Sequence, residues 1–113
     1  MCAKNYNLTN LTVIIDHNHL QSDGFTEDVM DHLSLADKLS AFGFNAIAAD
    51  GHSAEDLLAA FGKRDANKPN AIIAETVKGK GISFMENKKT WHHGVLTESL
   101  YNRAINELNK FNS

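Results

Sequence analysis

The chain has 113 residues, a formal net charge of −3 and a hydrophobic content of 42%. This composition is typical of a globular protein, and the length suits one small domain. The negative charge gives no basic surface for nucleic acid, and no apolar run approaches the ~20 residues of a membrane span. The single cysteine, Cys2, excludes an internal disulfide, and residues 1–6 lack the apolar centre of a secretory signal. We therefore expect a cytoplasmic protein.

Three apolar segments have the composition of buried strands in a parallel sheet. They are residues 11–15, 44–49 and 71–77. Helices are expected at residues 34–42, 53–63 and 97–110, with a shorter one beginning near residues 26–30. The order β-α-β-α-β-loop-α predicts an α/β fold with parallel strands and right-handed crossovers. No repeat or linker divides the chain, so residues 1–113 are treated as a single domain.

Local signals mark the ends and the inner faces of these helices. Gly43 stands where a C-cap glycine is expected, and Ser53, with Asp56 three residues later, is expected to cap the next helix. Helical spacing predicts three sets of inward-facing side chains. These are Leu35, Leu39 and Phe42; Leu57, Leu58 and Phe61; and Leu100, Ala104, Leu108 and Phe111.

The domain is expected to be partial. Three strands are few for a parallel sheet that must be covered on both faces. Residues 1–6 have the pattern of only the last turn of a helix. Both observations suggest that other segments complete the fold.

Polar residues follow each of the three expected strands. They are Asp16, Asn18 and Asp23; Asp50, Gly51 and His52; and Lys78, Lys80, His92 and His93. Ligands of open α/β sheets bind just beyond the carboxyl ends of the strands. Because parallel strands bring these ends to one edge, we expect the three groups to form a site together.

The chemistry of each group leaves alternatives open. An Asn18 side-chain oxygen with a nearby backbone carbonyl suits Mg²⁺ held together with a phosphate, but the same residues also suit an Asx-type turn. The Lys78-Gly79-Lys80-Gly81 segment suits pyrophosphate, although an exposed basic turn explains it equally well. The adjacent His92 and His93 suit phosphate binding, proton transfer or metal binding. Zinc is discounted because no further ligands occur at zinc spacing.

Four separated motifs carry a resemblance to a known family. VIIDHNHLQSDG, AFGFNAIAADGH, KPNAIIAETVKGKGISFMEN and WHHG follow one another in this order. The chain resembles the thiamine-diphosphate-binding domain of transketolases, in the split form found in bacteria and archaea. The resemblance covers nearly the whole chain, and it implies a partial parallel-stranded thiamine-diphosphate-binding fold.

The resemblance also implies roles for particular residues. Mg²⁺ is bound through the side chain of Asn18 and the backbone carbonyl of Leu20, and Lys78 lies near the diphosphate. A histidine after the tryptophan contacts the diphosphate and the substrate hydroxyls. An ungapped count from Lys78 gives His92, whereas a count from the following glycine gives His93. We favour His92 as the cofactor-binding and catalytic histidine and keep both as candidates.

The family pattern includes parts that these motifs do not contain. It has an upstream Gly-Asp-Gly segment whose aspartate binds the metal, and a pyrimidine-binding domain whose glutamate activates the cofactor. We expect both to come from partner chains, which makes the protein a heteromer. The expected function is that of a fragment or subunit of a transketolase-like transferase of the pentose phosphate pathway, which moves a two-carbon ketol unit between sugar phosphates. The chain alone is expected to be inactive.

Two other functions remain open at this point. One is a catalytically inactive, truncated interaction protein that keeps the surfaces of the family. The other is a generic phosphate-binding α/β module without thiamine diphosphate.

Overall fold

A computed structural model describes residues 1–21, 24–25 and 34–111. The expected short helix at residues 26–30 lies outside these residues, as does Asp23. The chain forms two compact units. Unit 1 comprises Met1–Asn18 and His32–Thr76, and unit 2 comprises His19–Asp31 and Val77–Ser113. Among the described helices, none is long and apolar enough to cross a membrane.

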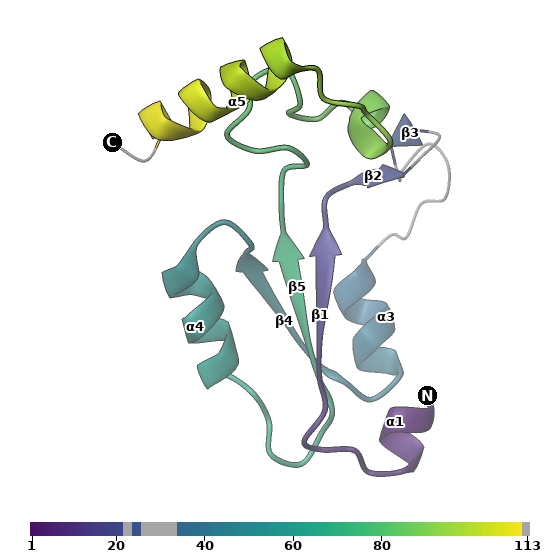
Figure 1. Ribbon diagram of the computed structural model, residues 1–113. Coiled ribbons are helices and arrows are strands. Elements are labelled where there is room, and N and C mark those ends of the chain that lie inside the picture. Colours follow the sequence, from purple (N-terminus) through teal and green to yellow (C-terminus); the bar gives the residue numbers. More distant parts are fainter. Residues whose placement is uncertain (22–23, 26–33, 112–113) are drawn as a thin grey trace. The chain divides into compact units, whose positions relative to one another are not determined.

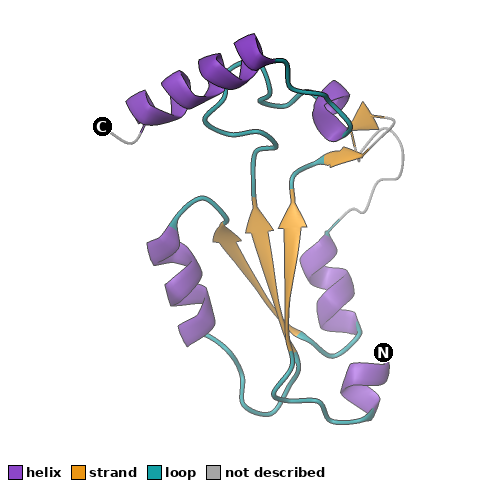
Figure 2. Ribbon diagram, viewed as in Figure 1, coloured by secondary structure: helices purple, strands orange, loops and turns teal. Residues whose placement is uncertain are grey.

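Unit 1 is built on a three-stranded parallel sheet with the strand order β1-β5-β4 (Figures 1 and 2). The strands are β1 (Thr12–His17), β4 (Asn45–Asp50) and β5 (Asn70–Glu75). The central strand, β5, is buried throughout except at Glu75, as its almost purely apolar sequence requires. The parallel α/β sheet predicted from the sequence is therefore confirmed, with strand ends that shift by one or two residues.

Three helices belong to unit 1: α1 (Cys2–Asn5), α3 (Leu35–Ala41) and α4 (Ala54–Gly62). Figure 1 shows α3 and α4 on either side of the sheet. The Ser53 hydroxyl accepts a hydrogen bond from the Asp56 backbone N–H at 3.1 Å, so the predicted N-cap of α4 is confirmed. Gly43, with a φ of +86°, follows the C-cap of α3 in the left-handed conformation that favours glycine, as predicted.

The core of unit 1 lies between α4 and the sheet. Ile47, Ala49, Ala60 and Ile72 form it, and Leu57 and Phe61 pack against it. The predictions for Leu58 and Phe42 were wrong, because these side chains are 73% and 48% exposed. Leu58 lies one position, or about 100°, around the helix from the inward-facing Leu57. Phe42 is the C-cap of α3 and lies beyond the last helical residue.

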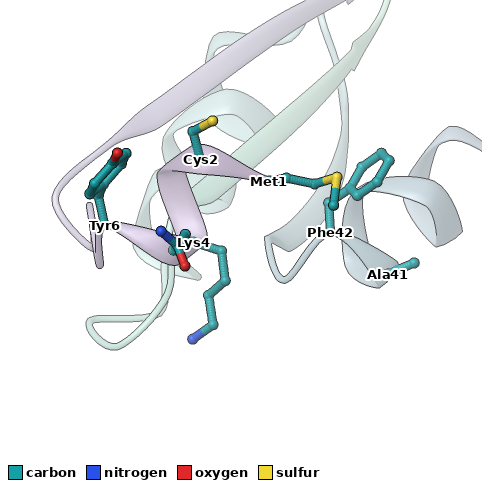
Figure 3. A pocket seen from close by; sticks show the side chains of 7 residues that line it. Met1, Cys2, Lys4, Tyr6, Ala41 and Phe42 are labelled. Carbon is teal, nitrogen blue, oxygen red and sulfur yellow. The ribbon is translucent and has the colours of Figure 1, made fainter.

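An open hollow of about 490 Å³ lies between α1 and the end of α3 (Figure 3). Met1, Tyr6 and Phe42 line it with exposed apolar side chains, and the free thiol of Cys2 also lies there. Both helices lead into the amino ends of strands. The hollow is therefore at the opposite end of the sheet from the carboxyl ends, where ligands of this fold class bind.

A buried asparagine joins β5 to the loop after α4. Asn70 is only 2% exposed, and its side-chain oxygen accepts hydrogen bonds from the Asn45 side chain at 2.9 Å and the Asp65 N–H at 2.8 Å. Its side-chain nitrogen donates to the carbonyls of Asp65 and Lys68 at 3.0 and 2.9 Å. All four bonds depend on the amide, which both donates and accepts.

Replacing Asn70 by alanine is expected to lower the free energy of unfolding by about 3 kcal/mol, because buried backbone groups lose their partners. Urea unfolding of the two proteins, in identical preparations, measures the difference. Asn67→Ala is the matched control, since Asn67 is an exposed asparagine of the same loop. Equal losses in the two variants would contradict a structural role for the Asn70 amide.

Unit 2 contains an antiparallel pair of two-residue strands, β2 (Leu20–Gln21) and β3 (Gly24–Phe25). A short 3-10 helix, η1 (Lys89–His92), and the long α5 (Glu98–Phe111) follow along the chain. The sequence predicted α5 to within one residue at each end. It did not predict β2, β3 or η1.

A carboxylate on α5 anchors the loop that precedes η1. Both the N–H and the hydroxyl of Ser83 donate to Glu107, at 2.6 and 2.9 Å, and Arg103 Nε donates to the same carboxylate at 2.9 Å. The Ser83 N–H, and after it the Arg103 side chain, lowers the pKa of Glu107. The Arg103 guanidinium also lies over the Phe84 ring at 5.0 Å. The loop therefore has a fixed base on which the histidine segment follows.

Candidate functional site

The carboxyl ends of the three strands in unit 1 are tied together by backbone hydrogen bonds. The Gly51 N–H, just after β4, donates to the Glu75 carbonyl at 2.8 Å. On the other side, the Thr76 N–H donates to the His17 carbonyl at 3.2 Å. The end of β5 is thus bonded to both neighbouring strand ends, which fixes the edge where the sequence predicts a site.

Side chains reinforce the connection between β1 and β5. The Thr76 hydroxyl donates to the Asp16 carboxylate, and His17 Nδ1 lies 2.8 Å from Glu75 Oε1. The side chains of His17 and Glu75 are 23% and 47% exposed, so solvent screens their interaction. These contacts fix the geometry of the strand end more than they stabilise the fold.

Gly51 allows β4 and β5 to approach each other closely at this edge. A Cβ at Gly51 would lie 2.4 Å from the Thr76 methyl and 3.0 Å from the Glu75 carbonyl oxygen. Any other residue here would have to push the strand ends apart. The turn beyond is held by Asp50, whose carboxylate accepts the His52 N–H at 2.8 Å.

Asn18, the predicted metal ligand, is half-buried and follows β1 directly. It belongs to unit 1 and lies two residues beyond Asp16. His19 has a φ of +57°, the left-handed conformation, and turns the chain before Leu20 opens β2 in unit 2. The Asn18 amide oxygen is thus placed at the carboxyl end of a strand.

The Lys78-Gly79-Lys80-Gly81 segment forms a tight turn in unit 2. Gly79 and Gly81 have φ values of +73° and +90°, and a Cβ at Gly79 would lie 2.8 Å from the Met85 backbone. Lys78 is half-buried, and its carbonyl accepts the Asn87 N–H at 3.0 Å. Both glycines are therefore needed for the turn itself.

The two candidate histidines follow Trp91 and are both exposed. The ring of Trp91 packs against Phe84 with a centroid separation of 5.4 Å, and a Cβ at Gly94 would clash with it. The His92 and His93 rings meet edge to face, with centroids 4.5 Å apart and an interplanar angle of 82°. The tryptophan thus anchors a segment that presents two imidazoles to solvent.

The predicted site residues are divided between the two units. Asn18 and the Asp50-Gly51-His52 turn belong to unit 1. The others, Leu20, Lys78, Lys80, His92 and His93, belong to unit 2. The expected meeting of all these groups in one site stays a prediction. Sequence reasoning missed Thr76, whose only local signal is that it is a hydroxyl residue just after the buried central strand.

Comparisons with known proteins place these features in a family. The family model "Transketolase, thiamine diphosphate binding domain" matches residues 1–109. The chain is 41% identical over 112 residues to a subunit of the apulose-4-phosphate transketolase from Phocaeicola vulgatus, covering 97% of this chain and 40% of that protein. It is 38% identical over 112 residues to the 6-deoxy-6-sulfo-D-fructose transketolase subunit SqwG of a Clostridium species, covering 97% of this chain and 41% of the relative.

Longer relatives match over the same region. Human transketolase is 41% identical over 108 residues, which cover 94% of this chain and 17% of that protein. The crystal structure of transketolase from Campylobacter jejuni superposes with a TM-score of 0.86 at 25% identity, over 96% of this chain and 17% of the other. The chain thus spans about two fifths or less of the length of these relatives. With a family model that matches almost its whole length, the chain belongs to the transketolase family, as part of its thiamine diphosphate-binding domain.

Proposed function

We propose that this chain is one of the subunits of a transketolase-like enzyme and contributes part of a site for Mg²⁺ and thiamine diphosphate. The enzyme would transfer a two-carbon ketol unit between sugar phosphates. The observation that carries the proposal is the match of the thiamine diphosphate-binding domain to residues 1–109, with Asn18 at the carboxyl end of β1. Two of the similar proteins are themselves named as subunits of transketolases.

The donor atoms fit a magnesium diphosphate. The Asn18 amide oxygen and the Leu20 backbone carbonyl are neutral hard oxygens, which Mg²⁺ accepts as ligands. Lys78 brings a cation, and the glycine turn that follows it brings backbone amides of the kind that bind phosphate oxygens. These groups would hold the metal and neutralise part of the diphosphate charge.

When bound, thiamine diphosphate supplies the carbanion chemistry of ketol transfer. The residues of this chain orient the diphosphate end and recognise the substrate. His92 is exposed and can donate a hydrogen bond from its ring to substrate hydroxyls, which supports its assignment as the catalytic histidine. His93 beside it is the alternative.

The proposal also requires a partner. Asn18 and Leu20 provide two of the oxygens in an octahedral magnesium site, and neither carries charge. A partner chain with a metal-binding carboxylate and a pocket for the aminopyrimidine ring would complete the site. Relatives that are named as subunits of larger transketolases support such an assembly.

Replacing Asn18 by alanine in the assembled enzyme is expected to weaken Mg²⁺-dependent binding of thiamine diphosphate by about 1–3 kcal/mol, as loss of one neutral ligand should. Calorimetric titrations of the cofactor at several Mg²⁺ concentrations measure the change. Asn10→Ala is the matched control, because Asn10 is exposed and precedes β1 rather than following it.

The same titrations with ATP and Mg²⁺ test the generic phosphate-binding function, for which the glycine turn is the supporting feature. Binding of ATP as tight as that of thiamine diphosphate would favour that function. An Asn18→Ala protein with unchanged cofactor affinity at every Mg²⁺ concentration would contradict the assignment of Asn18.

A further inference from the structure

Thr76 contacts all three strand ends of unit 1. Its hydroxyl donates to the carboxylate of Asp16 on β1, and its N–H donates to the carbonyl of His17 at 3.2 Å. Its methyl faces Gly51 after β4, so closely that a Cβ at Gly51 would lie 2.4 Å away. One half-buried side chain thus joins the ends of β1, β4 and β5.

The residues that Thr76 holds immediately precede Asn18. Asp16 and His17 are the last two residues of β1, and each is bonded to the end of β5. Beyond them the ladder of β1 with β5 stops, because the register ends at His17 and Glu75. The direction in which Asn18 leaves the sheet is therefore set by these contacts.

We infer that Thr76 is a positioning residue for the metal ligand Asn18, acting through the bond from its hydroxyl to Asp16. This inference rests on the proposed function of Asn18. Mg²⁺ demands near-ideal octahedral geometry, so a small change in the direction of one amide oxygen weakens its binding. Groups that orient metal ligands typically affect metal affinity even though they do not touch the ion.

A purely structural role makes a different prediction. Thr76 is the point of closest approach to Gly51, so its methyl contributes to packing whether or not a metal binds. Loss of the methyl should therefore affect unfolding, whereas loss of the hydroxyl should affect the Mg²⁺ dependence of cofactor binding. Two variants separate these contributions.

Thr76→Val removes the hydroxyl and keeps the shape of the side chain, and Thr76→Ser keeps the hydroxyl and removes the methyl. In the assembled enzyme, Thr76→Val is expected to raise the Mg²⁺ concentration for half-maximal thiamine diphosphate binding about 10-fold. Thr76→Ser should keep the wild-type value to within about 2-fold by the same reasoning. Calorimetry measures binding, and urea midpoints report stability separately. Thr12→Val, at the amino end of β1, is the control and should leave the Mg²⁺ dependence unchanged.

Equal Mg²⁺ dependence in Thr76→Val and wild type, with Asn18→Ala impaired, would overturn this inference and leave the proposed function standing. Unchanged binding in Asn18→Ala would overturn both. If Thr76→Val does not fold, Thr76→Ala and Thr76→Ser make the same comparison, because both lack the methyl and only serine retains the hydroxyl. Equal Mg²⁺ dependence in that pair would also overturn the role of the hydroxyl.

Discussion

Replacing His92 by alanine in the assembled enzyme is expected to reduce kcat about 100-fold, and to reduce it more than the same change at His93 does. His92 ends η1, and its exposed ring can donate to charge that develops on the substrate. An interaction made mainly in the transition state lowers kcat and kcat/KM together. Steady-state kinetics of ketol transfer between sugar phosphates measure both constants.

His93→Ala is a closely matched control for this experiment. The two rings are exposed neighbours in edge-to-face contact at 4.5 Å, so each substitution removes the same side chain from the same segment. The anchor of this segment is the packing of Trp91 against Phe84, and neither substitution removes it. Unfolding midpoints of the two variants should therefore agree. A larger loss of kcat in His93→Ala would assign the catalytic role to His93 instead.

The sheet of unit 1 was predictable because its signals are local. The central strand is a run of apolar residues from Ala71 to Ala74, and all of them are buried. The caps of α3 and α4 were predictable for the same reason, since Gly43 and Ser53 act on their own helix ends. The strands β2 and β3 are two residues long each, which is too short for alternation to indicate them.

The contacts that shape the candidate site were not predictable. Asp16 and Thr76 are 60 residues apart, and they meet only because the register pairs Asp16 with Ala74 at the end of β5. No local pattern contains that register. Asn18 was found because the family motif marks it, whereas Thr76 was missed because a hydroxyl residue after a strand has no chemical signature of its own.

The exposed face of β1 indicates how the chain behaves on its own. In the strand order β1-β5-β4, β1 forms an edge of the sheet. Ile14, Ile72 and Ile47 share one row of that sheet, yet Ile14 is 56% exposed while the other two are 0% and 9% exposed. A strand edge with unpaired backbone groups and an exposed apolar side chain is a template for pairing with another chain. We therefore expect self-association of the isolated chain, or its stabilisation by a partner.

The 113-residue chain on its own is expected to bind no thiamine diphosphate at micromolar concentration and to show no ketol transfer. Two neutral oxygens, from Asn18 and Leu20, do not displace the tightly held waters of Mg²⁺, and the proposal assigns recognition of the aminopyrimidine to a partner. Calorimetry with Mg²⁺, a ketol-transfer assay and light scattering test the isolated chain. In a second arm, the chain is mixed with a polypeptide that carries the Gly-Asp-Gly segment and the pyrimidine-binding domain. We expect binding, turnover and a defined mass to appear together in that mixture. Micromolar binding and turnover by the isolated chain would show that its own residues complete the site, and would contradict the assignment of a shared one.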